Sequence, residues 1–403
     1  MSVTFAQGFS AAGVAAGISA VEGKKDLALV VNNGPLDAAA GVFTSNRFCA
    51  APVQWSRNIV SDGHVKAVIL NSGGANACTG KPGYEQSKAT AEKVAGLIGA
   101  KAEDVAVCST GLIGELLPLD NVLSGADKAF ETLADTAEAG ADASHAIMTT
   151  DTHKKEYAIQ FELGGKTCTV GAIGKGSGMI APNMATMLAF YTTDAAVSPA
   201  LLEKALKTVV PGTYNQMSVD LDTSTNDTLI IMASGLAGNP EICEENEDYH
   251  AFVAALTAIA EHMCAEHAGD GEGATHLITC EVTHAPDLKT ARAVSRSVVC
   301  SNLFKAAVFG RDANWGRILC AIGYTPGDFS IDKVCVWLSS KAGEVYVCEN
   351  AAYHPYSEDE AAKVLAEHDI LVKVDMGTGE ASAKAWGCDL TYDYVKINGD
   401  YRT

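Results

Sequence analysis

Short runs of β-branched and other apolar residues alternate along this chain with longer amphipathic stretches, and this alternation constrains the fold more than any other feature. A helix with one apolar face must bury that face, and a neighbouring sheet offers the surface to do so. The pattern therefore predicts an α/β protein. The expected strands are Leu27–Val31, Val65–Leu70, Tyr157–Leu163, Thr167–Ile173, Thr228–Met232, Leu277–Val282, Val334–Leu338 and Ile370–Val374. The expected helices are Tyr84–Ile98, Asn121–Leu133, Pro199–Val209, Tyr249–His267 and Ala291–Phe304.

Glycines mark two of the element boundaries. Gly99 follows the first expected helix, and Gly164-Gly165 predicts a hairpin turn between the strands of Tyr157–Ile173. With 403 residues the chain exceeds one ordinary core, so two or more lobes are expected. Neither an internal repeat nor a low-complexity linker shows where those lobes divide.

The composition excludes several classes of protein. Hydrophobic residues make up 48% of the chain and charged residues 19%, which is typical of a compact globular enzyme. A formal net charge of −20 repels phosphate backbones and anionic membranes, so neither a nucleic acid nor a membrane is expected as a partner. No signal peptide or apolar span is apparent, and twelve scattered cysteines lack close pairs, which favours a soluble cytoplasmic protein with reduced thiols.

The most unusual segment places Gly174, Gly176 and Gly178 directly after a strand. A dinucleotide-binding loop would continue into a helix whose N-terminus holds phosphate, but Pro182 interrupts such a helix. A Walker loop fails as well, because Lys175 is followed by glycine and not by Ser or Thr. On spacing alone a glycine-rich connector is the better interpretation, and no cofactor is expected.

Two further patterns are weak candidates for chemistry. Cys264 and His267 lie one helical turn apart, yet zinc needs three or four converging ligands and the segment reads as a solvated acidic helix. We therefore expect no metal site. Ser177 lacks the GxSxG turn that presents a nucleophilic serine.

Thr186, within the sequence NMATM, has two possible interpretations. A single threonine is usually a β-branched packing residue, and local spacing favours that reading. A threonine becomes a nucleophile if its own α-amino group is freed to act as the base, with a pKa near ~8. This requires the Thr186 hydroxyl to attack the Ala185 carbonyl and form an ester that water resolves. Flanking glycines would permit the tight backbone turn that such an attack needs.

The segment from Lys175 to Leu188, KGSGMIAPNMATML, resembles the central signature of the ornithine acetyltransferase family, also called the glutamate N-acetyltransferase family. Other segments that resemble the family are spread over nearly the whole chain. They are NSGGANAC (71–78), STGLIG (109–114), MTTDT (148–152), DTSTND (222–227), GEGAT (271–275), GRDANWGR (310–317) and YVKINGDYRT (394–403).

The resemblance implies a fold and a reaction. The fold would be a layered sandwich with helices outside stacked mixed β-sheets, plus a smaller C-terminal lobe, in a self-cleaving N-terminal-nucleophile enzyme. Cleavage between Ala185 and Thr186 would give residues 1–185 and 186–403, which stay associated as two copies of each fragment. The acetyl group of N2-acetyl-L-ornithine would pass through Thr186 to L-glutamate in a ping-pong cycle of arginine biosynthesis. Whether acetyl-CoA also serves as a donor stays open.

The resemblance also assigns residues to roles, and it implies no cofactor or metal. Thr110 and Gly111 match the family's oxyanion hole, and Thr186 matches its nucleophile. The matching substrate-contacting residues are Thr152, Lys175, Thr186, Glu272, Asn398 and Thr403. Gly399 stands where alanine is common in the family, a change that would loosen the tail presenting Asn398 and Thr403.

Two other functions are compatible with the sequence. An amidohydrolase or aminopeptidase with the same fold would use water as the acceptor and release acetate whether or not glutamate is present. A catalytically silent amino-acid-binding or scaffold protein would be unaffected by Thr186→Ala, although Lys175, Thr186 and Glu272 are all retained.

Overall fold

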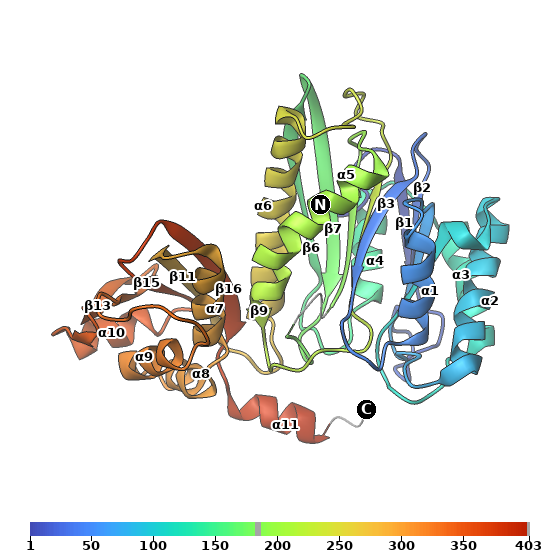
Figure 1. The fold of residues 1–403 in the computed structure, drawn as a ribbon. Coiled ribbons are helices and arrows are strands. Elements are labelled where there is room, and N and C mark those ends of the chain that lie inside the picture. Colours follow the sequence, from blue (N-terminus) through green and yellow to red (C-terminus); the bar gives the residue numbers. More distant parts are fainter. Residues whose placement is uncertain (182–186, 401–403) are drawn as a thin grey trace.

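A computed structural model describes residues 1–181 and 187–400, which form three β-sheets with helices around and between them (Figure 1). Sheet 1 has the order β1-β2-β4-β5, with strands Phe9–Val14, Leu27–Asn32, Ala67–Asn71 and Val105–Ser109. Sheet 2 has the order β3-β10-β8-β7-β6, with strands Ala38–Phe43, Thr228–Ala233, Leu188–Thr193, Lys166–Lys175 and Lys155–Leu163. Both sheets are mixed, because β4 and β5 are parallel, β8 and β10 are parallel, and their other pairs are antiparallel.

Sheets 1 and 2 form two layers, and the helices form three more: one outside each sheet and one between the two sheets (Figure 1). Helices α2 (Gly80–Ile98) and α3 (Leu119–Glu131) cover the outer face of sheet 1. Helices α5 (Pro199–Val209) and α6 (Glu247–Gly269) cover the outer face of sheet 2. Between the two sheets lie α1 (Ala51–Val60) and α4 (Ala137–Ala146), which touch strands of both.

The central strands of sheet 2 are buried on both faces, which explains their continuous apolar sequences. Phe190 of β8 and Ile230 of β10 join the core shared with sheet 1. Tyr191 and Ile231, their neighbours in sequence, point to the opposite face and join the core under α5 and α6.

The C-terminal lobe has a core of its own. Its sheet 3 has the order β14-β13-β12-β15-β11-β16-β9, with strands Ala352–Tyr353, Gly343–Glu349, Cys335–Ser340, Asp369–Asp375, Leu277–Ala285, Ala381–Cys388 and Met217–Ser218. Its helices are α7 (Leu288–Val299), α8 (Asn302–Phe309), α9 (Trp315–Gly323) and α10 (Glu358–Val364), and α11 (Tyr392–Asp400) follows the last strand. Three short 3-10 helices span Ala102–Asp104, Val210–Gly212 and Tyr214–Gln216. The short β9 comes from the sandwich segment and pairs with β16, so it connects the lobe to the sandwich.

The predicted α/β class, stacked mixed sheets and smaller C-terminal lobe are confirmed, with α2, α3, α5 and α6 outside the sheets as expected. The hairpin is also confirmed, because Leu163 pairs with Lys166 across Gly164 and Gly165, whose φ angles are +54° and +73°. Gly99 ends α2 in the left-handed conformation with φ +69°.

The expected single helix Ala291–Phe304 is wrong. Helix α7 ends at Val299, and α8 starts at Asn302 after an extended Ser301. The Ser301 hydroxyl accepts a hydrogen bond from the Phe304 amide at 3.3 Å and so caps the new helix. The apolar spacing continues through this break, which is why periodicity alone did not reveal it.

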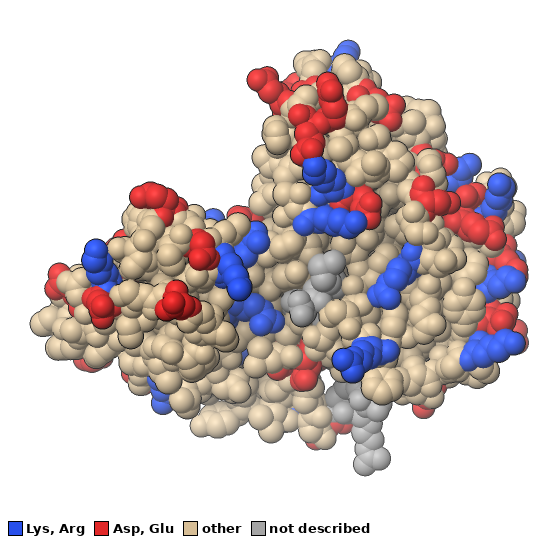
Figure 2. Space-filling model, viewed as in Figure 1, with Lys and Arg blue, Asp and Glu red and all other residues tan. Residues whose placement is uncertain are grey.

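Charged side chains are unevenly distributed on the molecular face in Figure 2. Lys and Arg side chains appear over α5 and near α7, on the two sides of the hollow between the sandwich and the C-terminal lobe. Asp and Glu side chains gather at the top of the sandwich. Across residues 1–181 and 187–400, no helix combines the length and the apolar character that crossing a membrane requires.

Candidate active site

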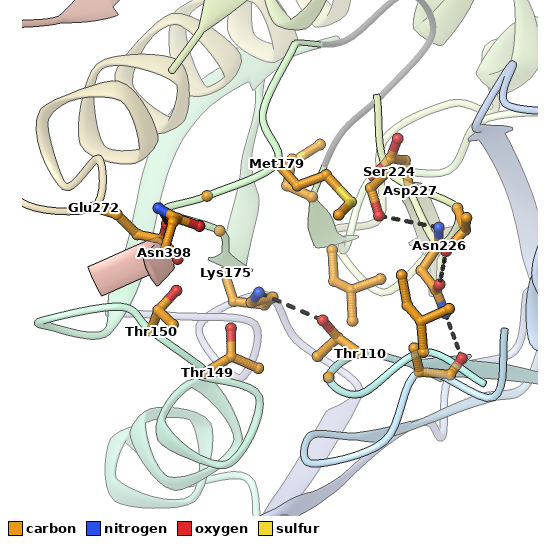
Figure 3. Close-up of a pocket in the computed structure, with 18 residues that line it drawn as sticks. Thr110, Thr149, Thr150, Lys175, Met179, Ser224, Asn226, Asp227, Glu272 and Asn398 are labelled. Atoms are coloured by element: carbon orange, nitrogen blue, oxygen red, sulfur yellow. Dashed lines mark hydrogen bonds between the residues drawn. The ribbon is translucent and has the colours of Figure 1, made fainter. Parts of the chain in front are cut away.

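A pocket lies where the ends of sheets 1 and 2 meet (Figure 3). Since β7 and β8 are antiparallel, the last residue of β7, Lys175, pairs with the first residue of β8, Leu188. The end of β5 and the loop before β10 reach the same place. The described residues around the pocket are Ala75, Thr110, Gly111, Ile113, Thr149, Thr150, Lys175, Gly176, Gly178, Met179, Met187, Leu188, Ser224, Thr225, Asn226, Asp227, Glu272 and Asn398.

Thr110 and Gly111, the predicted oxyanion hole, lie on the pocket wall directly after β5. The Thr110 amide donates to the Asn71 carbonyl at 2.9 Å, so its hydroxyl is the group left to face a substrate. Gly111 has φ +130°, and a Cβ there would lie 2.5 Å from the Gly73 carbonyl carbon. Only glycine fits this approach, which leaves the Thr110 hydroxyl and the Gly111 amide as candidate donors to an oxyanion.

Lys175 extends from the end of β7 toward Thr110, and its Nζ donates to the Thr110 Oγ1 at 3.5 Å (Figure 3). Burial lowers the pKa of Lys175 and nearby Lys155 lowers it further, while the carboxylates of Asp151, Glu272 and Asp227 oppose this shift. A lysine in such a site can hold a substrate carboxylate when it is charged.

Glu272 and Asn398 lie together at one side of the pocket, opposite the loop that carries Ser224, Asn226 and Asp227 (Figure 3). Asn398 belongs to α11, and its Nδ2 donates to the Glu272 Oε2 at 2.7 Å. The C-terminal helix therefore reaches the pocket, and the substrate contact that the resemblance implies for Asn398 stays a prediction.

Thr152 does not line the pocket. Its amide donates to the Asp270 Oδ2 at 3.1 Å, and its hydroxyl also donates to that carboxylate. Its neighbour Thr150 lines the pocket instead, with a hydroxyl 2.7 Å from the Ser177 Oγ. The predicted substrate contact of Thr152 stays a prediction.

Ala185, Thr186 and Thr403 lie outside the described residues, so the cleavage site, the nucleophile and one substrate contact stay predictions from the sequence. The described residues on each side of the 182–186 gap are both anchored. The Ala181 carbonyl accepts a hydrogen bond from the Thr223 hydroxyl at 3.0 Å, and the Met187 carbonyl accepts one from the Thr228 amide at 2.9 Å. Both anchors come from the stretch 223–228.

Two buried aspartates at the site were given no role from the sequence. Asp227 lines the pocket, and its Oδ2 has no hydrogen-bond partner among the described residues. Burial raises the pKa of Asp227 well above its usual range, although the Thr44 and Ser224 side chains and Lys175 lower it in part. Asp151 lies behind Lys175, with 4.0 Å between the Lys175 Nζ and the Asp151 Oδ2. Asp227 lies in the segment DTSTND and Asp151 in MTTDT, and both segments resemble the family. This resemblance is the sequence feature that could identify the two aspartates as site residues.

The weak candidates have structural explanations. Ser177 is fully buried and bonded to Thr150. The expected solvated face is wrong for Cys264 and His267, which are both buried, and Gly174 of β7 leaves room for the His267 imidazole. Within the described ranges, His, Cys, Asp and Glu form no group of three or more suited to a metal ion.

The fold and the pocket define an α/β enzyme whose site places two candidate oxyanion donors beside a buried lysine and a carboxylate, a set suited to acyl transfer on a small charged substrate. Comparison with known proteins identifies the family. Residues 10–403 match the model of the ArgJ family. The "Arginine biosynthesis bifunctional protein ArgJ" of Bifidobacterium longum is 55% identical over 100% of both chains. The chain therefore belongs to the ArgJ family, and the resemblance found in the sequence is confirmed.

Two solved structures are also similar. The arginine biosynthesis bifunctional protein argJ of Bacillus halodurans is 41% identical with a TM-score of 0.50, covering 53% of this chain and 98% of that chain. An ornithine acetyltransferase of Mycobacterium tuberculosis, solved with ornithine, is 46% identical with a TM-score of 0.42, covering 46% of this chain and 96% of that one.

Proposed function

We propose that this chain is an acetyltransferase of arginine biosynthesis that moves the acetyl group of N2-acetyl-L-ornithine to L-glutamate. Membership of the ArgJ family and 55% identity to a full-length relative named for arginine biosynthesis support the reaction. The observation that carries the chemistry is the group of Thr110, Gly111 and Lys175 beside the start of β8, two residues after Thr186.

The proposed cycle has two balanced half-reactions. The Thr186 oxygen attacks the acetyl carbonyl, the amide C–N bond breaks, and ornithine leaves with the hydroxyl proton on its α-nitrogen. The α-amine of glutamate then attacks the ester carbonyl, forms N-acetylglutamate and returns a proton to the Thr186 oxygen. In both steps the Thr110 hydroxyl and the Gly111 amide stabilise the tetrahedral oxyanion, for which each donor is worth about 10²–10³ in rate.

The remaining pocket residues hold the substrate in this proposal. The charged Lys175 binds the substrate carboxylate, and Glu272, oriented by Asn398, accepts a hydrogen bond from the substrate amine. Thr152 and Thr403 add contacts to the amino-acid backbone. The cycle needs no metal or cofactor.

Activation by cleavage between Ala185 and Thr186 is part of the proposal. It supplies the free α-amine that acts as the base for the Thr186 hydroxyl. The Bacillus halodurans chain offers support, because it is matched over 98% of its length yet spans only 53% of this chain. That share is close to the 218 of 403 residues that follow the cleavage site. We further propose an assembly of two N-terminal and two C-terminal fragments that acts in the cytoplasm.

The acceptor distinguishes this function from hydrolysis on the same fold. The purified protein is incubated with N2-acetylornithine, with and without glutamate, and ornithine, acetate and N-acetylglutamate are quantified. We expect N-acetylglutamate in step with ornithine only when glutamate is present. Acetate release that is independent of glutamate would instead identify an amidohydrolase. Since the relative's printed name includes "bifunctional", acetyl-CoA is tested as a second donor in the same assay.

A further inference from the structure

A row of side chains joined by hydrogen bonds and ion pairs, here called the ion chain, connects the proposed oxyanion site to the surface behind it. The Lys175 Nζ lies between the Thr110 Oγ1 at 3.5 Å and the Asp151 Oδ2 at 4.0 Å. The other oxygen of Asp151 accepts a hydrogen bond from the Lys155 Nζ at 2.7 Å. Lys155 also donates to the Asp270 Oδ2 at 2.5 Å. Asp270 in turn accepts a hydrogen bond from the Thr152 amide. Thr152, the exposed residue for which the resemblance implies a substrate contact, therefore lies at the outer end of the ion chain.

The charges in this chain are removed from water. The side chains of Asp151 and Lys155 are 0% exposed, and that of Lys175 is 9% exposed. Buried charges are stable only when opposite charges and hydrogen bonds compensate for lost hydration. Signs alternate along the chain from Lys175 through Asp151 and Lys155 to Asp270, which supplies that compensation.

Asp151 also fixes the backbone on two sides of the pocket. Its Oδ1 accepts a hydrogen bond from the Gly176 amide at 2.6 Å, and its Oδ2 accepts one from the Thr149 amide at 2.9 Å. Gly176 and Thr149 both line the pocket. A single carboxylate therefore orients Lys175 and the two segments beside it.

We propose that Asp151 and Lys155 are positioning residues that together set the location and the charge of the Lys175 amine. The inference rests on the proposed function in one respect, that a charged Lys175 holds the substrate carboxylate. Asp151 favours the charged amine, whereas Lys155 disfavours it by its own charge and by occupying one oxygen of Asp151. The two residues therefore act on Lys175 in opposite directions, although each stabilises the other.

Among the described residues, only a few other ionisable groups lie near Lys175. They are Glu272 and, when ionised, Asp227 on the pocket side, in addition to Asp151 and Lys155 behind it. His267 lies behind β7, and burial followed by Lys155 lowers its pKa to about 4. His267 is therefore neutral throughout the working pH range and does not contribute charge there.

The experiment measures the protonation of Lys175 directly on the full, processed protein. Trace labelling with methyl acetimidate, which reacts only with a neutral amine, is followed from pH 6 to 11 by mass spectrometry of the peptide that contains Lys175. The variants are Asp151→Asn, Lys155→Met and, as a matched control, Lys154→Met. Lys154 neighbours Lys155 in sequence but is exposed and bonded to Glu156.

We expect the midpoint of Lys175 labelling to move to lower pH in Asp151→Asn and to higher pH in Lys155→Met, each by about one pH unit or more. The control should label like the wild-type protein. At pH 8 the KM of Asp151→Asn for N2-acetylornithine should rise about tenfold or more, with a smaller change in kcat. A purely structural role would destabilise both variants but would not move their midpoints in opposite directions.

The inference is overturned if both midpoints stay in place or move the same way. If Asp151→Asn does not fold, the Lys155→Met variant is sufficient for the test. An unchanged or lowered midpoint of Lys175 labelling in that variant then overturns the inference. Because labelling does not depend on turnover, the test remains valid if acetyl transfer is absent. Failure of the proposed function and failure of this inference are therefore distinguishable.

Discussion

Gly178 packs directly against the Glu272 carboxylate, and a Cβ there would lie 2.4 Å from the Glu272 Cδ. Gly178→Ala should therefore displace Glu272 from Asn398 while the backbone stays in place, because the clashing atoms end a flexible side chain. We expect the KM for N2-acetylornithine to rise about tenfold or more, the equivalent of a lost charged hydrogen bond.

The matched control for this substitution is Gly96→Ala in α2, where an added Cβ meets no atom within 4 Å. There the change should leave the kinetics unaltered and stabilise the helix by about 1 kcal/mol at most. Unchanged KM values in Gly178→Ala would show that Glu272 does not hold the substrate amine.

We expect Asp227 to make the stability depend on pH. Burial raises the pKa of its carboxyl well above the usual range, so between the unfolded and folded pKa values the native state binds more protons. The contribution of Asp227 is then fully present at low pH and is lost as pH rises toward the folded pKa. Asp227→Asn removes this loss because an amide does not ionise.

The measurement for Asp227 is urea denaturation at pH 5 and pH 8, with both proteins carrying Thr186→Ala so that each remains one chain. At each pH we take the free energy of unfolding of Asp227→Asn minus that of the parent protein with Asp227. We expect this difference to be larger at pH 8 than at pH 5. An equal difference at the two pH values would mean that the carboxyl is not held neutral.

The sequence identified some site residues and not others for a physical reason. The resemblance to a known family assigns roles to Thr110, Gly111, Lys175 and Glu272, but none to Asp151 and Asp227, although these lie in resembling segments too. Asp227 and the ion chain behind Lys175 depend on burial and on partners more than 100 residues apart, such as Lys155 and Asp270. Local sequence does not reveal such proximity.

At the scale of elements, the strands that could be predicted have strong β-propensity of their own, such as β2 and β10. The unpredicted β1 and β3 have the sequences FSAAGV and AAAGVF, whose alanines and glycines favour no strand. They form strands because β2 and β10 offer partners. The unpredicted β8 follows a proline and glycine-rich stretch and is defined by its pairing with β7 and β10.

The break between α7 and α8 gives a test at this scale. Ser301→Ala removes the cap of α8 and should lower the free energy of unfolding by about 1 kcal/mol. Ser124→Ala, the same substitution on the exposed face of α3, should leave it unchanged or raise it slightly. Denaturation of both in the Thr186→Ala background measures the difference, and equal effects would argue against the cap.

At the scale of the molecule, cleavage would divide the strands of sheet 2 between two fragments and leave their hydrogen bonds in place. Strands β3, β6 and β7 precede Ala185, whereas β8 and β10 follow Thr186, and the order β3-β10-β8-β7-β6 interleaves the two fragments. Every hydrogen bond between β7 and β8 would become a bond between chains, within a continuous core.

We therefore expect the two fragments to co-elute in native size-exclusion chromatography and to separate only in denaturant. The uncleaved Thr186→Ala variant, of 41.9 kDa per chain, should elute at the same volume. Separation of the fragments under native conditions would contradict this account of sheet 2.

The central claim, acetyl transfer through Thr186, is tested most directly by intact-mass spectrometry of the denatured protein after brief incubation with N2-acetylornithine. The account predicts a fragment that begins at Thr186, carries one added acetyl group on that residue, and loses it when glutamate is added. A single uncleaved chain of 41.9 kDa, or a cleaved fragment never acetylated while ornithine is released, would contradict it.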